Sequence, residues 1–253
     1  MDCISVQSIF PIFRSQVLSS VFHSLGKGRF CFLSFEYDMI ERQTAKENDM
    51  RKVKQGVYSI FGRIYIPEEI LGKSDLLLHI SDTPSQVFPA VRKLIRKLKP
   101  KVIIHTGDLS DDIKLEFNEN LMKDFAREAK KIIRIMEFSS AVDIYIAMGN
   151  HDKFREVEKL KERSVLAETG KIVKIGDYDF HFSHYYEDVI TEPKDYNLYG
   201  HNPLMKNHKV RNRWFLNGVS SINVIDLSTG KVHELRYPWG TDDYRYRRRK
   251  RGL

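Results

Sequence analysis

Short runs of apolar residues alternate with amphipathic helical patterns between residues 76 and 147, and this alternation restricts the fold more than any other feature. Residues 76–81, 102–105 and 142–147 are continuous apolar runs of the kind found in strands that are buried on both faces. Between them, apolar side chains recur at helical spacing in residues 87–98 and 121–136. A strand, a helix and a second strand in this order form a parallel crossover, so the pattern predicts an α/β fold.

The second half of the chain is predicted to be mostly β-structure. A short charged helix is expected at residues 153–161, and the segments after it are short and alternate between apolar and polar residues. A crossover half and a β-rich half can pack as two mixed sheets with helices outside, which predicts an αββα sandwich. The expected strands are residues 172–175, 178–183, 196–199, 214–216, 221–226 and 231–237.

One ordered domain is predicted, covering residues 57–240. Its start is placed where residues 57–66 introduce aromatic and β-branched side chains. Residues 1–56 are expected to be an N-terminal extension, either disordered or lying before a true start at Met39 or Met50. Residues 241–253 are expected to form a basic C-terminal tail.

Six of the 42 basic residues that give the formal net charge of +8 lie in that tail, so the body of the protein is expected to be near neutral. A neutral body argues against nucleic acid held along a face, but the tail leaves contact with RNA or DNA open. No run approaches the roughly 18 uncharged apolar residues of a membrane helix, so no membrane partner is expected. Cys3 and Cys31 belong to no motif, which fits a reducing, cytoplasmic location. The six basic residues of the tail are Arg245, Arg247, Arg248, Arg249, Lys250 and Arg251.

Polar residues follow five of the predicted strands at the point where each strand ends. In open α/β sheets, ligands bind in the crevice beyond the carboxyl ends of the strands. Carboxylate, amide and imidazole side chains gathered there predict a site for a divalent metal ion. The residues that gather at these strand ends are Asp82, Asp108, Asn150, His151, His184 and His201.

These residues carry a resemblance to the calcineurin-like phosphoesterases. Gly107-Asp108, Gly149 to Asp152, His184 and Gly200-His201 occur in the order and rough spacing of that family's motifs. The resemblance spans residues 76 to 237 and implies a metallophosphoesterase-type αββα sandwich that holds two metal ions. It also implies that the domain at residues 57–240 is a calcineurin-like phosphoesterase domain.

Two departures from the family pattern affect the same metal site. The first motif, Asp-x-His in the family, is Asp82-Thr83-Pro84 here, and the last, Gly-His-x-His, ends in Pro203. Proline carries no ligand atom on its side chain. In the family, both of the histidines that proline replaces here belong to the first metal site. The first site therefore retains only Asp82 and the shared Asp108.

The second site would retain a full set of ligands, so one tight and one weak metal site are expected. Its four ligands are Asp108, Asn150, His184 and His201. Two carboxylates alone can still hold Mg²⁺ or Mn²⁺ loosely. The expected cofactor is Mn²⁺, with Mg²⁺, Ni²⁺, Zn²⁺ or Fe as alternatives.

The resemblance implies a metal-dependent phosphoric ester hydrolase acting on a phosphodiester or phosphomonoester. In this scheme His151 would protonate the leaving oxygen, and Asp152 would orient its imidazole and favour the cationic form. Two alternatives stay open: a catalytically degenerate binding module, and a nuclease or RNA-processing factor that uses the basic tail. Five other histidines are interpreted as structural: His79, His105, His181, His208 and His233.

Overall fold

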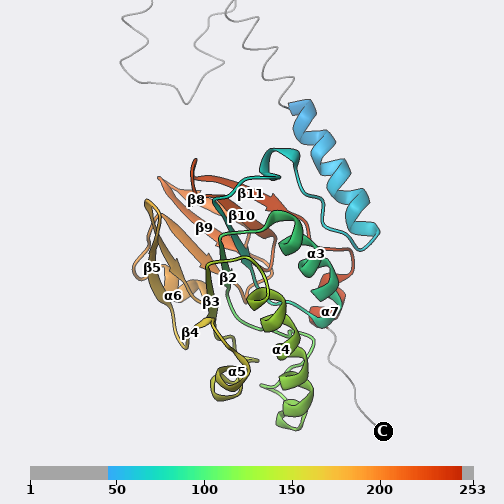
Figure 1. The fold of residues 1–253 in the computed structure, drawn as a ribbon, viewed down its shortest axis with the longest axis vertical. Coiled ribbons are helices and arrows are strands. Elements are labelled where there is room, and N and C mark those ends of the chain that lie inside the picture. The colour runs from blue at the N-terminus through green and yellow to red at the C-terminus, as the bar shows by residue number, and fades with distance from the viewer. Residues whose placement is uncertain (1–44, 247–253) are drawn as a thin grey trace, which may run out of the picture. The chain divides into compact units, whose positions relative to one another are not determined.

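The computed structural model describes residues 45–246 and contains two mixed β-sheets (Figure 1). The first sheet has the strand order β11-β10-β1-β2-β3-β4. β1 to β4 are parallel, whereas β10 is antiparallel to both β1 and β11. The predicted parallel crossover is therefore confirmed. The strands are β1 (Leu76–Ile80), β2 (Val102–His105), β3 (Asp143–Ala147), β4 (Val165–Ala167), β10 (Ile222–Asp226) and β11 (Lys231–Leu235).

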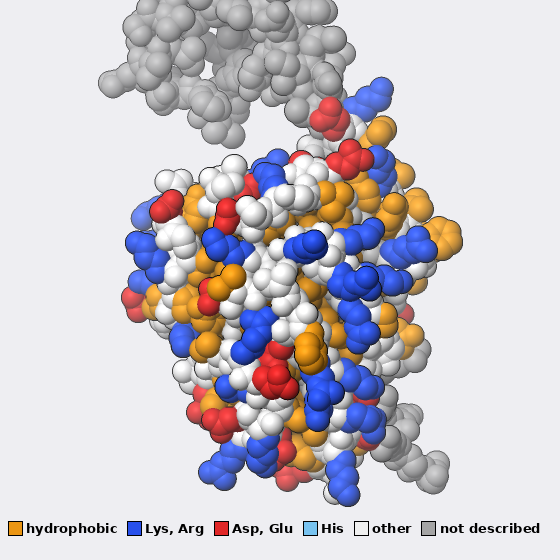
Figure 2. All heavy atoms as spheres, in the orientation of Figure 1, with side chains coloured by type: hydrophobic (Ala, Val, Ile, Leu, Met, Phe, Trp, Pro, Cys, Tyr) orange, Lys and Arg blue, Asp and Glu red, His pale blue; other side chains and the backbone are white. Residues whose placement is uncertain are grey.

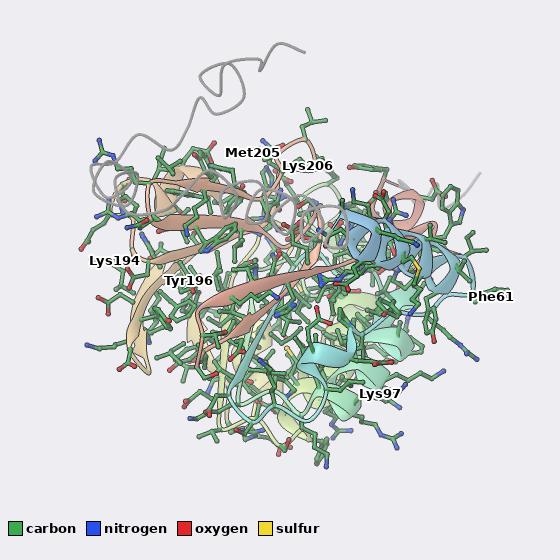
Figure 3. All side chains as sticks on the ribbon, turned by 90° about the horizontal axis from the view of Figure 1, so that it is seen from above. Phe61, Lys97, Lys194, Tyr196, Met205 and Lys206 are labelled. Carbon is green, nitrogen blue, oxygen red and sulfur yellow. The ribbon has the colours of Figure 1, made fainter. Side chains whose placement is uncertain are left out.

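The second sheet has the strand order β5-β6-β7-β9-β8. β6, β7 and β9 are parallel to one another, and the two outer strands are antiparallel to their neighbours. Tyr196, labelled in Figure 3, stacks on Phe180 in this sheet with ring centroids 4.9 Å apart. The strands are β5 (Lys171–Ile175), β6 (Tyr178–Phe182), β7 (Tyr196–Tyr199), β8 (His208–Val210) and β9 (Arg213–Asn217).

The central strand β1 shows how the layers are held together. Leu76, Leu78 and Ile80 pack into the core shared with the helices, whereas Leu77 packs with residues of the second sheet. Each of these side chains is fully buried, which is worth about 1.5–3 kcal/mol for a leucine or isoleucine. Both faces of the first sheet are thus covered, as the continuous apolar run predicted.

Helices complete the predicted αββα arrangement. α3 (Phe88–Leu98) and α4 (Met122–Glu137) cover one face of the first sheet (Figure 1). α6 (Tyr186–Val189) packs beside β7 on the second sheet. The expected charged helix at residues 153–161 is α5 (Phe154–Leu160). In the described part of the chain, short 3-10 turns lie in the connections: η2 (Glu68–Ile70), η3 (Ser85–Val87) and η4 (Glu119–Leu121).

The structure differs from the sequence prediction near both ends of the domain. Residues 45–60 are helical, although residues 57–66 have the composition of a strand. Residues 241–246, predicted to open the basic tail, instead form helix α7 (Thr241–Tyr246), in which Arg245 is buried. The rest of the predicted tail, and residues 1–44 of the predicted extension, lie outside the described residues. β4, β8 and α6 were not predicted at all.

One basic surface lies on the body of the domain and not on its tail. The exposed side of α3 carries Arg92, Lys93, Arg96 and Lys97, and Figure 2 shows Lys and Arg side chains gathered over this part of the molecule. Lys97 is labelled in Figure 3. Among the described residues, no helix is long and apolar enough to cross a membrane.

Candidate metal centre

The five predicted ligands come together in the structure at one edge of the two sheets. Neighbouring parallel strands run in register, for example with Ile80 opposite His105 and Phe182 opposite Leu198, so the residues that follow them emerge side by side. Asp82 follows β1, Asp108 follows β2, and Asn150 follows β3. His184 and His201 follow β6 and β7 of the second sheet.

Four donor atoms converge at the predicted second site. Asn150 Oδ1 lies 3.0 Å from His184 Nε2 and 3.2 Å from His201 Nδ1. The two imidazole nitrogens are 3.2 Å apart, and Asp108 Oδ2 lies 3.6 Å from His184 Nε2. Two oxygens and two nitrogens with lone pairs turned toward a common centre form a suitable ligand set for a divalent transition metal.

Hydrogen bonds behind these ligands fix which atoms face the centre. His184 Nδ1 lies 2.7 Å from the carbonyl oxygen of Thr106, so Nδ1 carries the proton and Nε2 presents its lone pair. Asn150 Nδ2 donates to Glu116 Oε2 at 2.5 Å, which turns Oδ1 toward the histidines. Without a cation, acceptor atoms would face one another here, so the residues present fit a metal ion.

The glycines of the motifs allow the strand ends to approach one another. Gly107 has φ of +94°, and a Cβ built on it would lie 2.6 Å from the backbone nitrogen of Gly149. A Cβ on Gly149 would lie 2.1 Å from Asp108 Oδ1. Larger residues would therefore force the β2 and β3 loops apart. This close approach explains why glycine precedes Asp108 and Asn150.

Three of the predicted ligands themselves have left-handed backbone conformations. The φ angles are +48° for Asp82, +53° for Asp108 and +61° for His201. Such angles are uncommon outside glycine and are concentrated at functional sites. The conformations are held by bonds between the loops, such as those from the backbone nitrogens of Asp82 and Thr83 to the carbonyls of Gly107 and Asp108, at 3.0 and 3.1 Å.

The buried carboxylates of the site also favour a cation. Burial raises the pKa of Asp108 well above its usual value, and the neighbouring Asp82, Asp111 and Asp152 raise it further. Asp82, Asp108 and His184 each offer a ligand atom within 4.8 Å of the others. A positive ion at this position would stabilise the ionised carboxylates.

His151 lines the same pocket but is not part of the four-atom set. Its backbone nitrogen donates to Asp108 Oδ1 at 2.9 Å, and its Nδ1 lies 3.7 Å from Glu116 Oε2. Burial lowers the pKa of His151 to about 3, and the charge of Lys114 contributes in the same direction. A neutral imidazole still has one N–H that can donate to an oxygen.

The structure does not support the predicted pairing of Asp152 with the His151 imidazole. Asp152 Oδ2 accepts the backbone N–H groups of Asp108 and Gly149 at 2.7 and 2.9 Å, and Oδ1 accepts that of Leu109 at 3.0 Å. Asp152 therefore joins the β2 and β3 loops. The imidazole of His151 instead lies near the carboxylate of Glu116, with Asp108 and Asp111 also within 4.8 Å.

The depleted first site contains residues that the sequence motifs did not identify. Pro203 lines the pocket beside Asp82, and Asp111, Lys114 and Arg245 line it as well. Asp108, Asp111 and His151 form a second group whose ligand atoms lie within 4.8 Å of one another. Asp111 and Lys114 follow Asp108 closely in the sequence, so their position in that loop was the available signal. Nothing in the sequence signalled that Arg245 belongs to the pocket, since this residue lay in the predicted tail.

Two of the histidines interpreted as structural have clear partners. His79 Nε2 lies 2.9 Å from Thr106 Oγ1, and His105 Nε2 lies 3.0 Å from Thr83 Oγ1. Burial lowers the pKa of each imidazole to about 3. These histidines therefore stay neutral and hold the strand ends that carry the predicted ligands.

Comparison with known proteins identifies the family. The model of the calcineurin-like phosphoesterase family matches residues 76–249, which is more than half of the chain. The protein therefore belongs to the calcineurin-like phosphoesterases, as the motifs predicted. A comparison with curated proteins finds no match.

Solved structures with a similar fold include enzymes and a sorting protein. An archaeal phosphodiesterase is 17% identical, with a TM-score of 0.43, covering 63% of this chain and 98% of its own. YfcE, a phosphoesterase from E. coli, is 13% identical, with a TM-score of 0.45 and coverage of 64% and 99%. Vacuolar Protein Sorting 29 from Cryptosporidium parvum is 18% identical, with a TM-score of 0.38 and coverage of 65% and 96%. These similarities are too distant to assign an activity.

Proposed function

We propose that the protein is a metal-dependent phosphoesterase that hydrolyses a phosphodiester or a phosphomonoester. The observation that carries this proposal is the convergence of Asp108, Asn150, His184 and His201, whose donor atoms lie 3.0 to 3.6 Å from their neighbours in the set. Family membership supports the same reaction class. Mn²⁺ is the proposed ion because two of the four ligand atoms are oxygens, which suit Mn²⁺.

A divalent metal held by these four residues would polarise the phosphoryl oxygens and lower the pKa of a water molecule. The remaining steps concern the residues of this chain. His151 lies next to the ligands and is the proposed donor of a proton or hydrogen bond to the leaving oxygen. Glu116 contacts both Asn150 and His151, so it is placed to position the two side chains together.

A single hydrolysis assay tests this proposal. Wild-type protein with Mn²⁺ should hydrolyse a generic aryl phosphodiester, and the His201→Ala variant should lose that activity because one of the four ligands is removed. The variant also serves as a control for a contaminating enzyme. Activity that persists unchanged in His201→Ala would contradict the proposed site. A wild type that hydrolyses nothing with Mn²⁺, Mg²⁺, Ni²⁺ or Zn²⁺ would contradict the proposal that the protein is an enzyme.

Metal content gives an independent prediction. After dialysis, the protein should retain about one equivalent of Mn²⁺, because the second site has four ligands and the first has lost two histidines. Elemental analysis of dialysed wild type and of His184→Ala measures this directly. The variant should retain far less. Two equivalents held firmly by the wild type would show that the first site is not depleted.

Pro84 and Pro203 favour one competing function, a binding module with a degenerate site. The hydrolysis assay separates the two, because a binding module would retain the fold without turnover. A cytoplasmic location, predicted from the isolated cysteines, stays a prediction. So does contact of the C-terminal residues with nucleic acid.

A further inference from the structure

Lys114 is a cation inside the candidate site for which the family motifs provide no role. It lies in the loop that follows β2, six residues after Asp108. Its side chain lines the same pocket as Asp82, Asp108 and His151. Only 20% of that side chain is exposed, so the ammonium group is held within the pocket and does not extend freely into solvent.

The backbone around Lys114 is fixed on both sides. Ile113 and Leu115 are buried in the core, so the chain is anchored immediately before and after the lysine. Earlier in the same loop, the backbone nitrogen of Asp111 donates to the carbonyl of Thr83 at 3.3 Å. The Asp112 carboxylate accepts the backbone N–H and the hydroxyl of Ser85, each at 2.8 Å. These contacts hold the backbone that carries Lys114 in a fixed position beside the pocket.

The charges of the pocket show why a cation is needed there. Asp82, Asp108 and Asp111 are all buried, and Pro84 and Pro203 cannot hold a metal ion beside them. Lys114 forms an ion pair with Asp111, whose side chain is 5% exposed. The pair places one positive charge where the family's first metal would otherwise neutralise carboxylates.

Arg245, the other cation of the pocket, is already committed to the fold. Its guanidinium donates to the carbonyls of Asp82, Val219 and Ser81 at 2.8, 2.9 and 3.4 Å, and to Asp242 at 2.8 Å. An ammonium has three N–H donors, and among the described interactions Lys114 makes a hydrogen bond only to Asp111. Lys114 is therefore the cation of this pocket that can also bind a ligand.

We propose that the Lys114 ammonium binds a non-bridging phosphoryl oxygen of the substrate in place of the depleted first metal site. This inference rests on the proposed phosphoesterase function and names a further substrate-binding residue for it. One divalent metal and one ammonium carry less positive charge than two divalent metals. The pocket should therefore favour the monoanion of a phosphodiester over the dianion of a phosphomonoester.

Binding of inorganic phosphate tests the role of Lys114 without relying on turnover. Calorimetric titration of the Mn²⁺-loaded protein should give a phosphate Kd that is roughly tenfold or more weaker in Lys114→Met, because a charge-assisted hydrogen bond is lost. Lys114→Arg should lose less phosphate affinity than Lys114→Met. Lys153→Met is the matched control, since Lys153 is a neighbouring lysine, 3.7 Å from Glu119, whose loss should leave the Kd unchanged.

The Lys114→Met variant leaves the buried Asp111 carboxylate without its partner, which can disturb folding. The double variant Lys114→Met with Asp111→Asn removes that unpaired charge. It should keep the weak phosphate binding of the single variant. Elemental analysis should find the same Mn²⁺ content in Lys114→Met as in the wild type. A second firmly held equivalent in the variant would mean that Lys114 only blocks a metal site, and would overturn the inference.

The remaining outcomes separate this inference from the proposed function. Equal phosphate affinity in Lys114→Met and Lys153→Met, or no phosphate binding by the Mn²⁺-loaded wild type, would also overturn the role of Lys114. Phosphate binding that depends on Lys114 in a protein that hydrolyses no ester would contradict the proposed enzyme alone. Hydrolysis by the wild type together with an unchanged phosphate affinity in Lys114→Met would contradict the proposed role of Lys114 alone.

Discussion

Replacing His151 with alanine should lower the turnover of an alkyl phosphodiester by roughly 10²- to 10⁴-fold, the usual contribution of a general acid. The imidazole is buried beside the four proposed ligands and packs near Phe117, with ring centroids 5.7 Å apart. It is therefore held next to the position that a leaving oxygen would occupy. Steady-state kinetics of His151→Ala with saturating Mn²⁺ measures the effect.

The choice of leaving group distinguishes proton donation from a general loss of structure. A 4-nitrophenyl ester has a good leaving group and needs little protonation, so the variant should lose less activity on it than on an alkyl ester. His208→Ala is the control, because this histidine lies on β8 and should not affect either rate. Equal losses on both esters would argue against a general acid.

Metal analysis of the same variant addresses the other reading of His151. Its ring could also act as a ligand, because Asp108, Asp111 and His151 offer ligand atoms within 4.8 Å of one another. If His151 is the proton donor, His151→Ala should retain as much Mn²⁺ as the wild type. Loss of the metal together with the activity would assign His151 to metal binding.

The positions of the five proposed ligands could be predicted because local sequence determines them. Each one follows a short apolar strand, and parallel strands in register bring their ends to the same edge of a sheet. The glycines before Asp108 and Asn150 could be read from the sequence only as parts of the motifs. The close approach of the two loops that requires them is seen in the structure.

The role of Asp152 could not be predicted in this way. The resemblance to the family implied that Asp152 orients the His151 imidazole. In the structure its carboxylate instead accepts three backbone N–H groups, those of Asp108, Leu109 and Gly149. Only the tertiary arrangement of the two loops shows this.

Segments at the ends of the domain were missed for a related reason. Residues 45–60 form a helix with mostly exposed side chains, including Val53 and Ile60, so they lack the apolar stripe from which a helix is recognised. β4 and β8 have three residues each, too few to show a period. Arg245 is one of several arginines in a run, and its sequence neighbours give no indication that it is buried.

That burial changes how the C-terminal residues should be tested. A truncation of residues 244 to 253, made to test contact with nucleic acid, would remove part of α7 and with it the bonds of Arg245 to the domain. A deletion restricted to residues 247–253 avoids this. It removes five of the six basic residues while leaving the described helix in place.

Arg245→Met should lower the free energy of unfolding by roughly 2 to 5 kcal/mol, because each buried carbonyl left without its donor costs about 1–3 kcal/mol. The arginine side chain is 3% exposed, and its shortest bonds to backbone are those to Asp82 and Val219, at 2.8 and 2.9 Å. Its guanidinium also lies 4.5 Å from the centre of the Tyr237 ring. Methionine would fill much of the space but replace none of these hydrogen bonds.

Chemical denaturation followed by circular dichroism measures this loss as a lower midpoint with an unchanged slope. Arg236→Met is the matched control, since Arg236 is exposed and a surface change of this kind should stay within about 0.5 kcal/mol. The denaturation midpoint of Arg245→Lys should lie between those of Arg245→Met and Arg236→Met, because lysine retains the charge but not the planar set of donors. The bond to the carbonyl of Asp82 also ties α7 to the turn that carries a proposed ligand. A midpoint for Arg245→Met equal to that of Arg236→Met would show that α7 and its arginine do not stabilise the site.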